Sequence, residues 1–107
     1  MSRPDKLIIV GDSAFAEIAC EYFEHDTAFQ VACFAVERAF RKRETLVGKP
    51  VVDLEDLAQA FPPREHAFYA AITYGQLNRL RRRLHDRMID AGYPAASCAW
   101  RFFKVAD

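Results

Sequence analysis

A strand, a tight turn and a helix follow one another between residues 7 and 23, and this stretch constrains the fold more than any other. Residues 7–10 (LIIV) form an apolar run rich in β-branched side chains, which predicts a short buried strand. Gly11 opens the turn, and Asp12 and Ser13 are residue types that cap helix N-termini. Such an arrangement aims backbone N–H groups and the positive end of a helix dipole at one spot, which suits an anion such as a phosphate.

Strands and helices alternate along the rest of the chain. The helix after the turn is predicted to reach Phe23, and helical spacing places four residues on its apolar face: Phe15, Ile18, Ala19 and Tyr22. Apolar runs, capping residues and Gly or Pro stops define the later elements. These are strands at Phe29–Val36, Val51–Val52 and Ala67–Ile72, helices at Leu54–Ala60 (capped by Asp53) and Gln76–Ala91 (stopped by Gly92), and a possible last strand at Tyr93–Cys98.

This alternation predicts a single α/β domain with a Rossmann-like parallel sheet of four to five strands and helices on both faces. Ligands of such sheets bind beyond the carboxyl ends of the strands, where the strand order reverses. We therefore expect a pocket formed by three segments: Gly11–Phe15, Val36–Glu37 and Ile72–Gly75.

Composition narrows the class of protein. At 107 residues with 51% hydrophobic content, the chain is long enough for one domain with a sizeable core. Fifteen basic and fifteen acidic residues cancel, so no net field attracts nucleic acid or an anionic membrane. No apolar run approaches the roughly 20 residues that span a bilayer, and residues 1–5 lack a signal-peptide core. We expect a cytoplasmic protein, in which Cys20, Cys33 and Cys98 are buried, reduced thiols.

Two segments carry most of the positive charge. The segment from Arg38 to Thr45 holds four cations around Phe40, and it is either a solvated loop or a phosphate contact. The long helix near the C-terminus carries five arginines away from its leucine and methionine stripe: Arg79, Arg81, Arg82, Arg83 and Arg87. We interpret this second group as a solvated helix face.

The turn at residues 11–16 is a degraded form of the dinucleotide-binding fingerprint. Gly11 keeps the first glycine, but Ser13 replaces the second and Ala16 the third. Asp12 adds a carboxylate beside the expected anion site, and Glu37, after the second strand, is placed to accept hydrogen bonds from sugar hydroxyls. The alternative is that Gly11 is only a tight turn, Asp12 a cap and Glu37 a surface residue.

Catalytic groups are few. His25, His66 and His85 share no metal-ligand spacing and stand beside no nucleophile, so we expect ordinary surface histidines. Ser13 has no G-x-S-x-G setting. Tyr74, after a strand end, is either a ligand contact or a half-buried loop residue. We expect no self-sufficient active site and no metal site.

Four segments together resemble a known domain: LIIVGDSAFAE at 7–17, FAV at 34–36, LVGKPVVDLEDL at 46–57 and AAITYGQLNRLR at 70–81. They are similar to the N-terminal Rossmann-like (PglD-type) domain of bacterial sugar O- and N-acyltransferases of the sialic acid O-acetyltransferase group. The resemblance covers about residues 6–98, nearly the whole chain.

The resemblance implies a domain that binds the nucleotide part of a UDP-linked sugar in bacterial surface glycan (polysaccharide) biosynthesis. In that family a following β-helix domain of hexapeptide repeats binds acetyl-CoA, supplies the catalytic histidine and forms the trimer. Carried over by position, the nucleotide-sugar contacts are Gly11, Asp12, Ser13, Phe15, Glu37, Ile72, Thr73 and Tyr74. No catalytic residue and no cofactor is then expected in residues 1–107. Residues 98–107 are either a tail or the start of the β-helix domain.

Three functions remain open at this point. The first is a nucleotide-sugar-binding domain of a sugar acetyl- or acyltransferase, inactive without its β-helix domain. The second is a stand-alone interaction or regulatory domain that keeps the fold and has lost the ligand. The third, a small NAD-dependent oxidoreductase, is disfavoured by the degraded fingerprint and by the lack of a catalytic partner.

Overall fold

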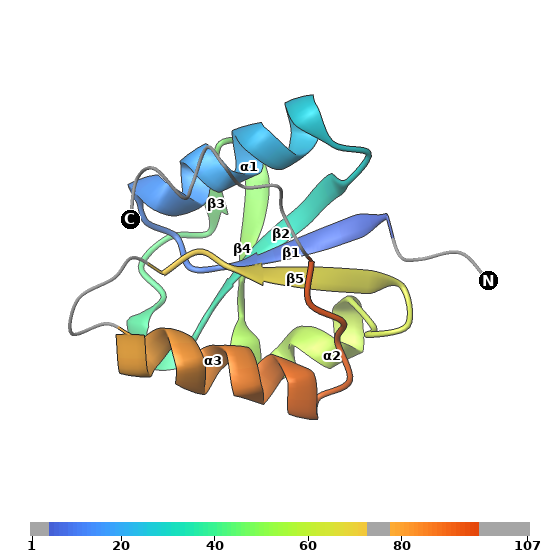
Figure 1. Ribbon diagram of the computed structural model, residues 1–107. Helices are drawn as coiled ribbons and strands as arrows, with labels where there is room; N and C mark the ends of the chain where they lie inside the picture. Colours follow the sequence, from blue (N-terminus) through green and yellow to red (C-terminus); the bar gives the residue numbers. More distant parts are fainter. Residues whose placement is uncertain (1–4, 73–77, 97–107) are drawn as a thin grey trace.

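The computed structural model describes residues 5–72 and 78–96, which form one compact α/β domain (Figure 1). Its five-stranded sheet has the order β3-β4-β2-β1-β5. The strands are β1 (Lys6–Val10), β2 (Gln30–Val36), β3 (Thr45–Leu46), β4 (Lys49–Asp53) and β5 (His66–Ala70). The helices are α1 (Ala14–Asp26), α2 (Leu57–Ala60) and α3 (Asn78–Asp90), with short 3₁₀ turns η1 (Arg38–Phe40) and η2 (Leu54–Asp56).

The sheet confirms the predicted parallel architecture. β1 lies between β2 and β5 and pairs parallel with both, and β4 pairs parallel with β2. The sequence did not predict β3, which pairs antiparallel with β4 through Leu46 and Lys49. Its two residues are too few to show a strand pattern. The hairpin turn between them uses Val47 at φ +43° and Gly48 at φ +81°.

Two apolar cores lie on opposite faces of the sheet, with α1 covering one face and α2 and α3 the other (Figure 1). Successive side chains of a strand point to opposite faces. In β1, Leu7 and Ile9 therefore join the α1 core, whereas Ile8 and Val10 join the α3 core. All four side chains are buried, which explains why the sequence shows an unbroken apolar run here.

The predicted apolar face of α1 was wrong by about one residue in helix rotation. Phe15 and Tyr22 are only partly buried and Ile18 is 47% exposed, so Ala19 is the one residue of that group inside the core. The buried residues are Ala16, Ala19, Cys20 and Phe23. Small side chains let the helix approach the sheet closely, and the Phe23 ring fills the space at its C-terminal half, 5.7 Å from the Phe29 ring and 5.2 Å from the Tyr69 ring.

Several other element boundaries differ from the predictions. The helix expected at Leu54–Ala60 is split into η2 and α2, and the Asp53 side chain makes no cap hydrogen bond. The expected last strand is reduced, among the described residues, to one parallel bridge between Ala95 and Phe68. The predicted stop at Gly92 is confirmed: its φ is +99°, and its N–H donates to the Ile89 carbonyl.

Side-chain burial confirms one prediction and corrects another. Cys20 and Cys33 are buried free thiols, as expected, and Cys98 lies outside the described residues. His66, expected on the surface, is only 4% exposed. Its Nδ1 lies 3.0 Å from the Pro62 carbonyl oxygen and its ring packs edge-on against Phe61, because the turn before β5 folds back over the strand. No helix in the described part of the chain is long and apolar enough to cross a membrane.

Candidate functional site

A pocket of about 210 Å³ lies at the carboxyl ends of β1, β2 and β5, where the sequence predicted one. Its lining comprises Val10, Gly11, Asp12, Ser13, Ala35, Val36, Glu37, Phe40, Ala71, Ile72 and Leu84. The pocket therefore brings together five of the predicted site residues: Gly11, Asp12, Ser13, Glu37 and Ile72. Phe15 is not part of the lining and packs against the α1 core instead. Thr73 and Tyr74 lie outside the described residues.

Gly11 is required by the fold at this point. Its φ is +119°, and a Cβ there would lie 2.9 Å from the Ala71 carbonyl oxygen and 3.3 Å from Cδ1 of Ile72. Its N–H donates to the Ala35 carbonyl at 2.9 Å. This amide is therefore engaged by β2, and any anion at the turn must use other donors. The positive φ and the close backbone approach together explain the glycine without a ligand.

The next two residues form the polar edge of the pocket. Asp12 lies 3.6 Å from Nε of Arg43, so a cation partly offsets the negative charge that the sequence placed beside the site. Ser13 is exposed at the N-cap of α1 and makes no side-chain cap hydrogen bond there. Its hydroxyl therefore does not cap the helix.

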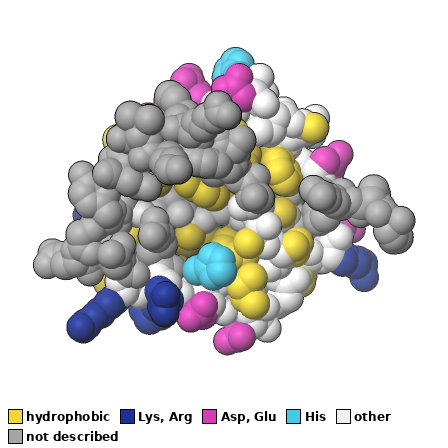
Figure 2. Space-filling model, in the orientation of Figure 1, with side chains coloured by type: hydrophobic (Ala, Val, Ile, Leu, Met, Phe, Trp, Pro, Cys, Tyr) yellow, Lys and Arg dark blue, Asp and Glu magenta, His cyan; other side chains and the backbone are white. Residues whose placement is uncertain are grey.

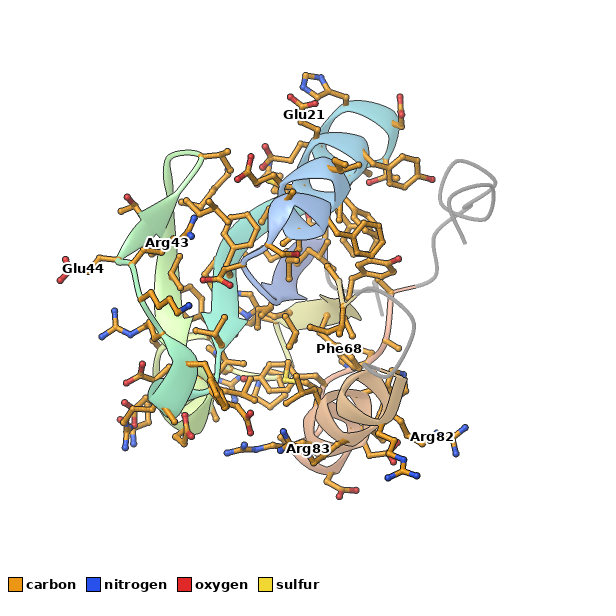
Figure 3. The ribbon with its side chains drawn as sticks, turned by 90° about the vertical axis from the view of Figure 1, so that its left-hand side faces the viewer. Glu21, Arg43, Glu44, Phe68, Arg82 and Arg83 are labelled. Carbon is orange, nitrogen blue, oxygen red and sulfur yellow. The ribbon has the colours of Figure 1, made fainter. Side chains whose placement is uncertain are left out.

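Glu37 joins the end of β2 to α3 through two arginines. Its carboxylate accepts hydrogen bonds from Arg83 at 2.8 and 3.1 Å and from Arg87 at 3.4 Å. The Arg83 hydrogen bonds hold the pKa of Glu37 below its ordinary value, although partial burial opposes them. Arg83 is exposed, as expected for a solvated helix face, but the sequence did not predict that it and Arg87 bind Glu37. Figure 3 shows Arg83 and Arg82 leaving α3 on opposite sides.

The cationic segment after β2 is held mainly by carboxylates of the protein. Arg38 donates to Asp53 at 3.0 Å and to Asp56 at 2.8 Å, and Nε of Arg41 donates to Asp53 at 2.6 Å. These hydrogen bonds lower the pKa of Asp53, with Arg38 the largest contributor. The segment from Arg38 to Thr45 is exposed throughout, as the solvated-loop alternative predicts, and its ion pairs with Asp53 and Asp56 were not predicted. The phosphate contact stays a prediction.

Five lining residues lie outside the three predicted segments: Val10, Ala35 and Ala71, which directly precede those segments, and Phe40 and Leu84, which do not. Phe40 lies in η1 and lines the pocket although 65% of it is exposed. The signal was present as a lone aromatic residue among cations directly after a strand. Leu84 belongs to the buried stripe of α3, and only the packing of that helix brings it to the strand ends.

The polar groups of the described pocket lining are two carboxylates and one hydroxyl. Asp12, Ser13 and Glu37 are the polar side chains among the described lining residues, and none of these residues is a histidine or a cysteine. Within residues 5–72 and 78–96, no group of three or more His, Cys, Asp or Glu side chains is placed to hold a metal ion. An ionised Glu37 can accept hydroxyl hydrogens from a ligand, since a carboxylate has about four acceptor sites.

The fold and pocket define the class: a Rossmann-like α/β domain with a pocket at the strand ends, where ligands of such sheets bind. The chain is similar in fold to the acetyltransferase domain of PglB from Neisseria gonorrhoeae FA1090, solved alone and in complex with acetyl coenzyme A (TM-score 0.64 and 18% identity for each). It is also similar to the methyltransferase FkbM from Methylobacillus flagellatus KT (TM-score 0.62, 16% identity).

These similarities concern part of each neighbour. The alignments cover 84% and 83% of this chain and 41% of the PglB domain in both structures, and 88% of this chain and 24% of FkbM. No protein-family model matches the sequence, and no curated protein matches it. At these identities the likeness establishes the fold, which is shared by an acetyltransferase domain and a methyltransferase.

Proposed function

We propose that this chain is the nucleotide-sugar-binding domain of a bacterial sugar acetyl- or acyltransferase acting in the cytoplasm on surface glycan precursors. The observation that carries the proposal is the pocket that joins Gly11, Asp12, Ser13, Glu37 and Ile72 at the strand ends. Fold similarity to the PglB acetyltransferase domain supports it. The motifs from residue 7 to residue 81 that resemble the PglD-type domain point to the same function.

The ligand we propose is a UDP-linked sugar. Glu37 accepts hydrogen bonds from its hydroxyl groups, while Arg83 and Arg87 keep the carboxylate ionised and fixed. Phe40 and Ile72 supply apolar surface for the flat base. The volume of about 210 Å³ accommodates only part of such a ligand, so the remainder extends along the surface beyond Ser13.

Acyl transfer in this proposal takes place outside residues 1–107. Acetyl-CoA, the catalytic histidine and the trimer contacts would belong to a β-helix domain, as the resemblance implies. We expect no acetyl transfer from this chain alone, because the described pocket offers a hydrogen-bond acceptor but no histidine to deprotonate a sugar amine or hydroxyl. Nucleic acid and membrane insertion have no part in the proposed role.

A second candidate, an interaction or regulatory domain without a small ligand, is favoured by one observation. Arg83 already occupies both oxygens of Glu37, so the pocket carboxylate is satisfied without a ligand. NAD binding is less well supported than either, because the Gly11 amide is engaged by Ala35 and Ser13 brings a side chain where a pyrophosphate needs bare backbone.

Calorimetric titration with UDP, a UDP-amino sugar and NAD separates these functions. The proposed function requires heat with UDP and more with the UDP-amino sugar, and about tenfold weaker binding by Glu37→Gln, a loss of about 1.4 kcal/mol. Glu21→Gln is the matched control, since Glu21 is exposed on α1 away from the pocket (Figure 3). No heat with any ligand supports the interaction domain, and heat with NAD alone contradicts the proposal.

A further inference from the structure

A second cavity lies on the other side of α3 from the proposed nucleotide-sugar pocket. It is an open groove of about 880 Å³ between α3 and the outer edge of β5. Three alanines line it, Ala70, Ala95 and Ala96, together with the aromatic residues Phe68 and Tyr69. Arg79, Arg82, His85 and Asp86 complete the described lining. Because the alanine side chains are short, a ligand can reach both the backbone of this region and the helix.

Arg79 and Arg82 share one property with Arg64 that the other described arginines lack: none of the three has a described carboxylate within ion-pair distance. The five that do are Arg38, Arg41, Arg43, Arg83 and Arg87. Arg79 and Arg82 are exposed, line the groove, and have no carboxylate partner among the described residues. Spaced by three residues in α3, they lie on the same helix face about one turn apart. Figure 2 shows Lys and Arg side chains gathered over the start of α3.

The other charged groups of the groove lie further along α3. The His85 ring packs against Phe68, with ring centroids 5.1 Å apart, which fixes it against the groove wall. Its Nδ1 lies 3.7 Å from the Asp86 carboxylate. Asp86, the single described acid of the lining, is thus within ion-pair distance of His85 but of neither Arg79 nor Arg82. A concave surface concentrates the field of these two arginines more than a flat one does.

We propose that this groove is a second binding site, for a ligand with two neighbouring anionic oxygen groups held by Arg79 and Arg82. Pyrophosphate and a di- or tricarboxylate share this chemistry. Guanidinium groups bind both kinds of group through paired N–H donors, and two of them one helical turn apart suit two linked anionic groups better than one. The site is independent of the nucleotide-sugar pocket, because Arg83 and Leu84 face that pocket and Arg79 and Arg82 line the groove.

Titration of the whole chain with inorganic pyrophosphate and, separately, with citrate tests the site and distinguishes the two sources of charge. The double variant Arg79→Ala/Arg82→Ala should weaken binding of the preferred anion at least about tenfold. Arg64→Ala is the matched control, since Arg64 is exposed, has no described carboxylate partner and is absent from the described lining of the groove. Circular dichroism establishes that the double variant is folded.

Backbone amide shifts locate the bound anion. Pyrophosphate or citrate should shift the amides of Ala70, His85 and Ala95, and these shifts should disappear in the double variant. Three outcomes overturn the proposal: neither anion binds, the double variant binds as the parent does, or Arg64→Ala weakens binding equally. Titration of the same double variant with UDP distinguishes the two proposed sites. If pyrophosphate binding is lost while UDP binding is unchanged, the lost binding belongs to the groove and not to the nucleotide-sugar pocket.

Discussion

Arg83 on α3 holds both carboxylate oxygens of Glu37 at the end of β2, at 2.8 and 3.1 Å, although 46 residues separate them. This ion pair joins one wall of the pocket to α3, whose Leu84 also lines the pocket. The pair also keeps the carboxylate of Glu37 ionised, because it lowers the pKa of that group. The contact therefore connects the stability of the domain with the charge of its candidate site.

Glu37→Gln should lower the free energy of unfolding at neutral pH, and this destabilisation should diminish in acid. The pKa of Glu37 is lowered below 4.5 in the folded protein, so its stabilising contribution is present above that value and disappears as pH falls through the folded pKa. Urea denaturation at pH 7 and pH 3 measures this. The parent should be the more stable at pH 7, and the difference between the two proteins should be smaller at pH 3; an equal difference at both pH values would contradict the ion-pair explanation.

Gly11→Ala should destabilise the domain more than Gly48→Ala does. Both glycines have positive φ, which costs a residue with a Cβ roughly 1–2 kcal/mol. Only at Gly11 does the new Cβ also meet a backbone carbonyl, at 2.9 Å from the Ala71 oxygen, whereas nothing lies within 4 Å at Gly48. Chemical denaturation measures the free energy of unfolding of both variants. The loss in Gly48→Ala gives the cost of positive φ, and any further loss in Gly11→Ala gives the cost of the contact with Ala71. Equal losses would show that close approach at Gly11 contributes nothing.

Phe23→Ala and Phe40→Ala should differ strongly in stability. Phe23 is fully buried, so its truncation leaves a cavity and should cost about 3–5 kcal/mol. Phe40 is 65% exposed, and its truncation should leave the free energy of unfolding nearly unchanged. The second variant should instead weaken UDP binding, since Phe40 lines the pocket. A stable Phe40→Ala protein that binds UDP as the parent does would remove Phe40 from the proposed site.

Cys33 should resist thiol reagents until the protein unfolds. Burial in the core between the sheet and α3 raises the pKa of its thiol to about 12, and burial also raises the pKa of Cys20. The thiolate is the reactive form, so both cysteines should be silent toward a disulfide reagent at pH 8. A Cys98→Ser variant leaves Cys20 and Cys33 as the two cysteines of the chain, so the reagent reports on these thiols alone. Both should react together when urea unfolds the protein. Rapid reaction of either in the native state would contradict their burial.

The amino-acid sequence by itself determined the arrangement of this domain and the place of its pocket. The apolar run before Gly11, the helix signals after it and the alternation that follows permit few folds other than a parallel sheet covered on both faces. In such a sheet the strand ends meet at one edge, so Gly11, Glu37 and Ile72 were bound to lie near one another. These features are local or follow from topology, which is why a pattern of residues reveals them.

Only the tertiary structure decided how the side chains are used. Helical spacing in α1 allowed Phe15, Ile18 and Tyr22 to be the core face, but close packing on the sheet selected the small residues and Phe23 instead. The partners of Glu37 and Asp53 are arginines 46 and 15 residues away, and pairing at such separations leaves no periodic signal. The opening strand, turn and helix thus fixed the place of the pocket. Contacts between residues far apart in the sequence decided which of its charged side chains are already paired within the protein.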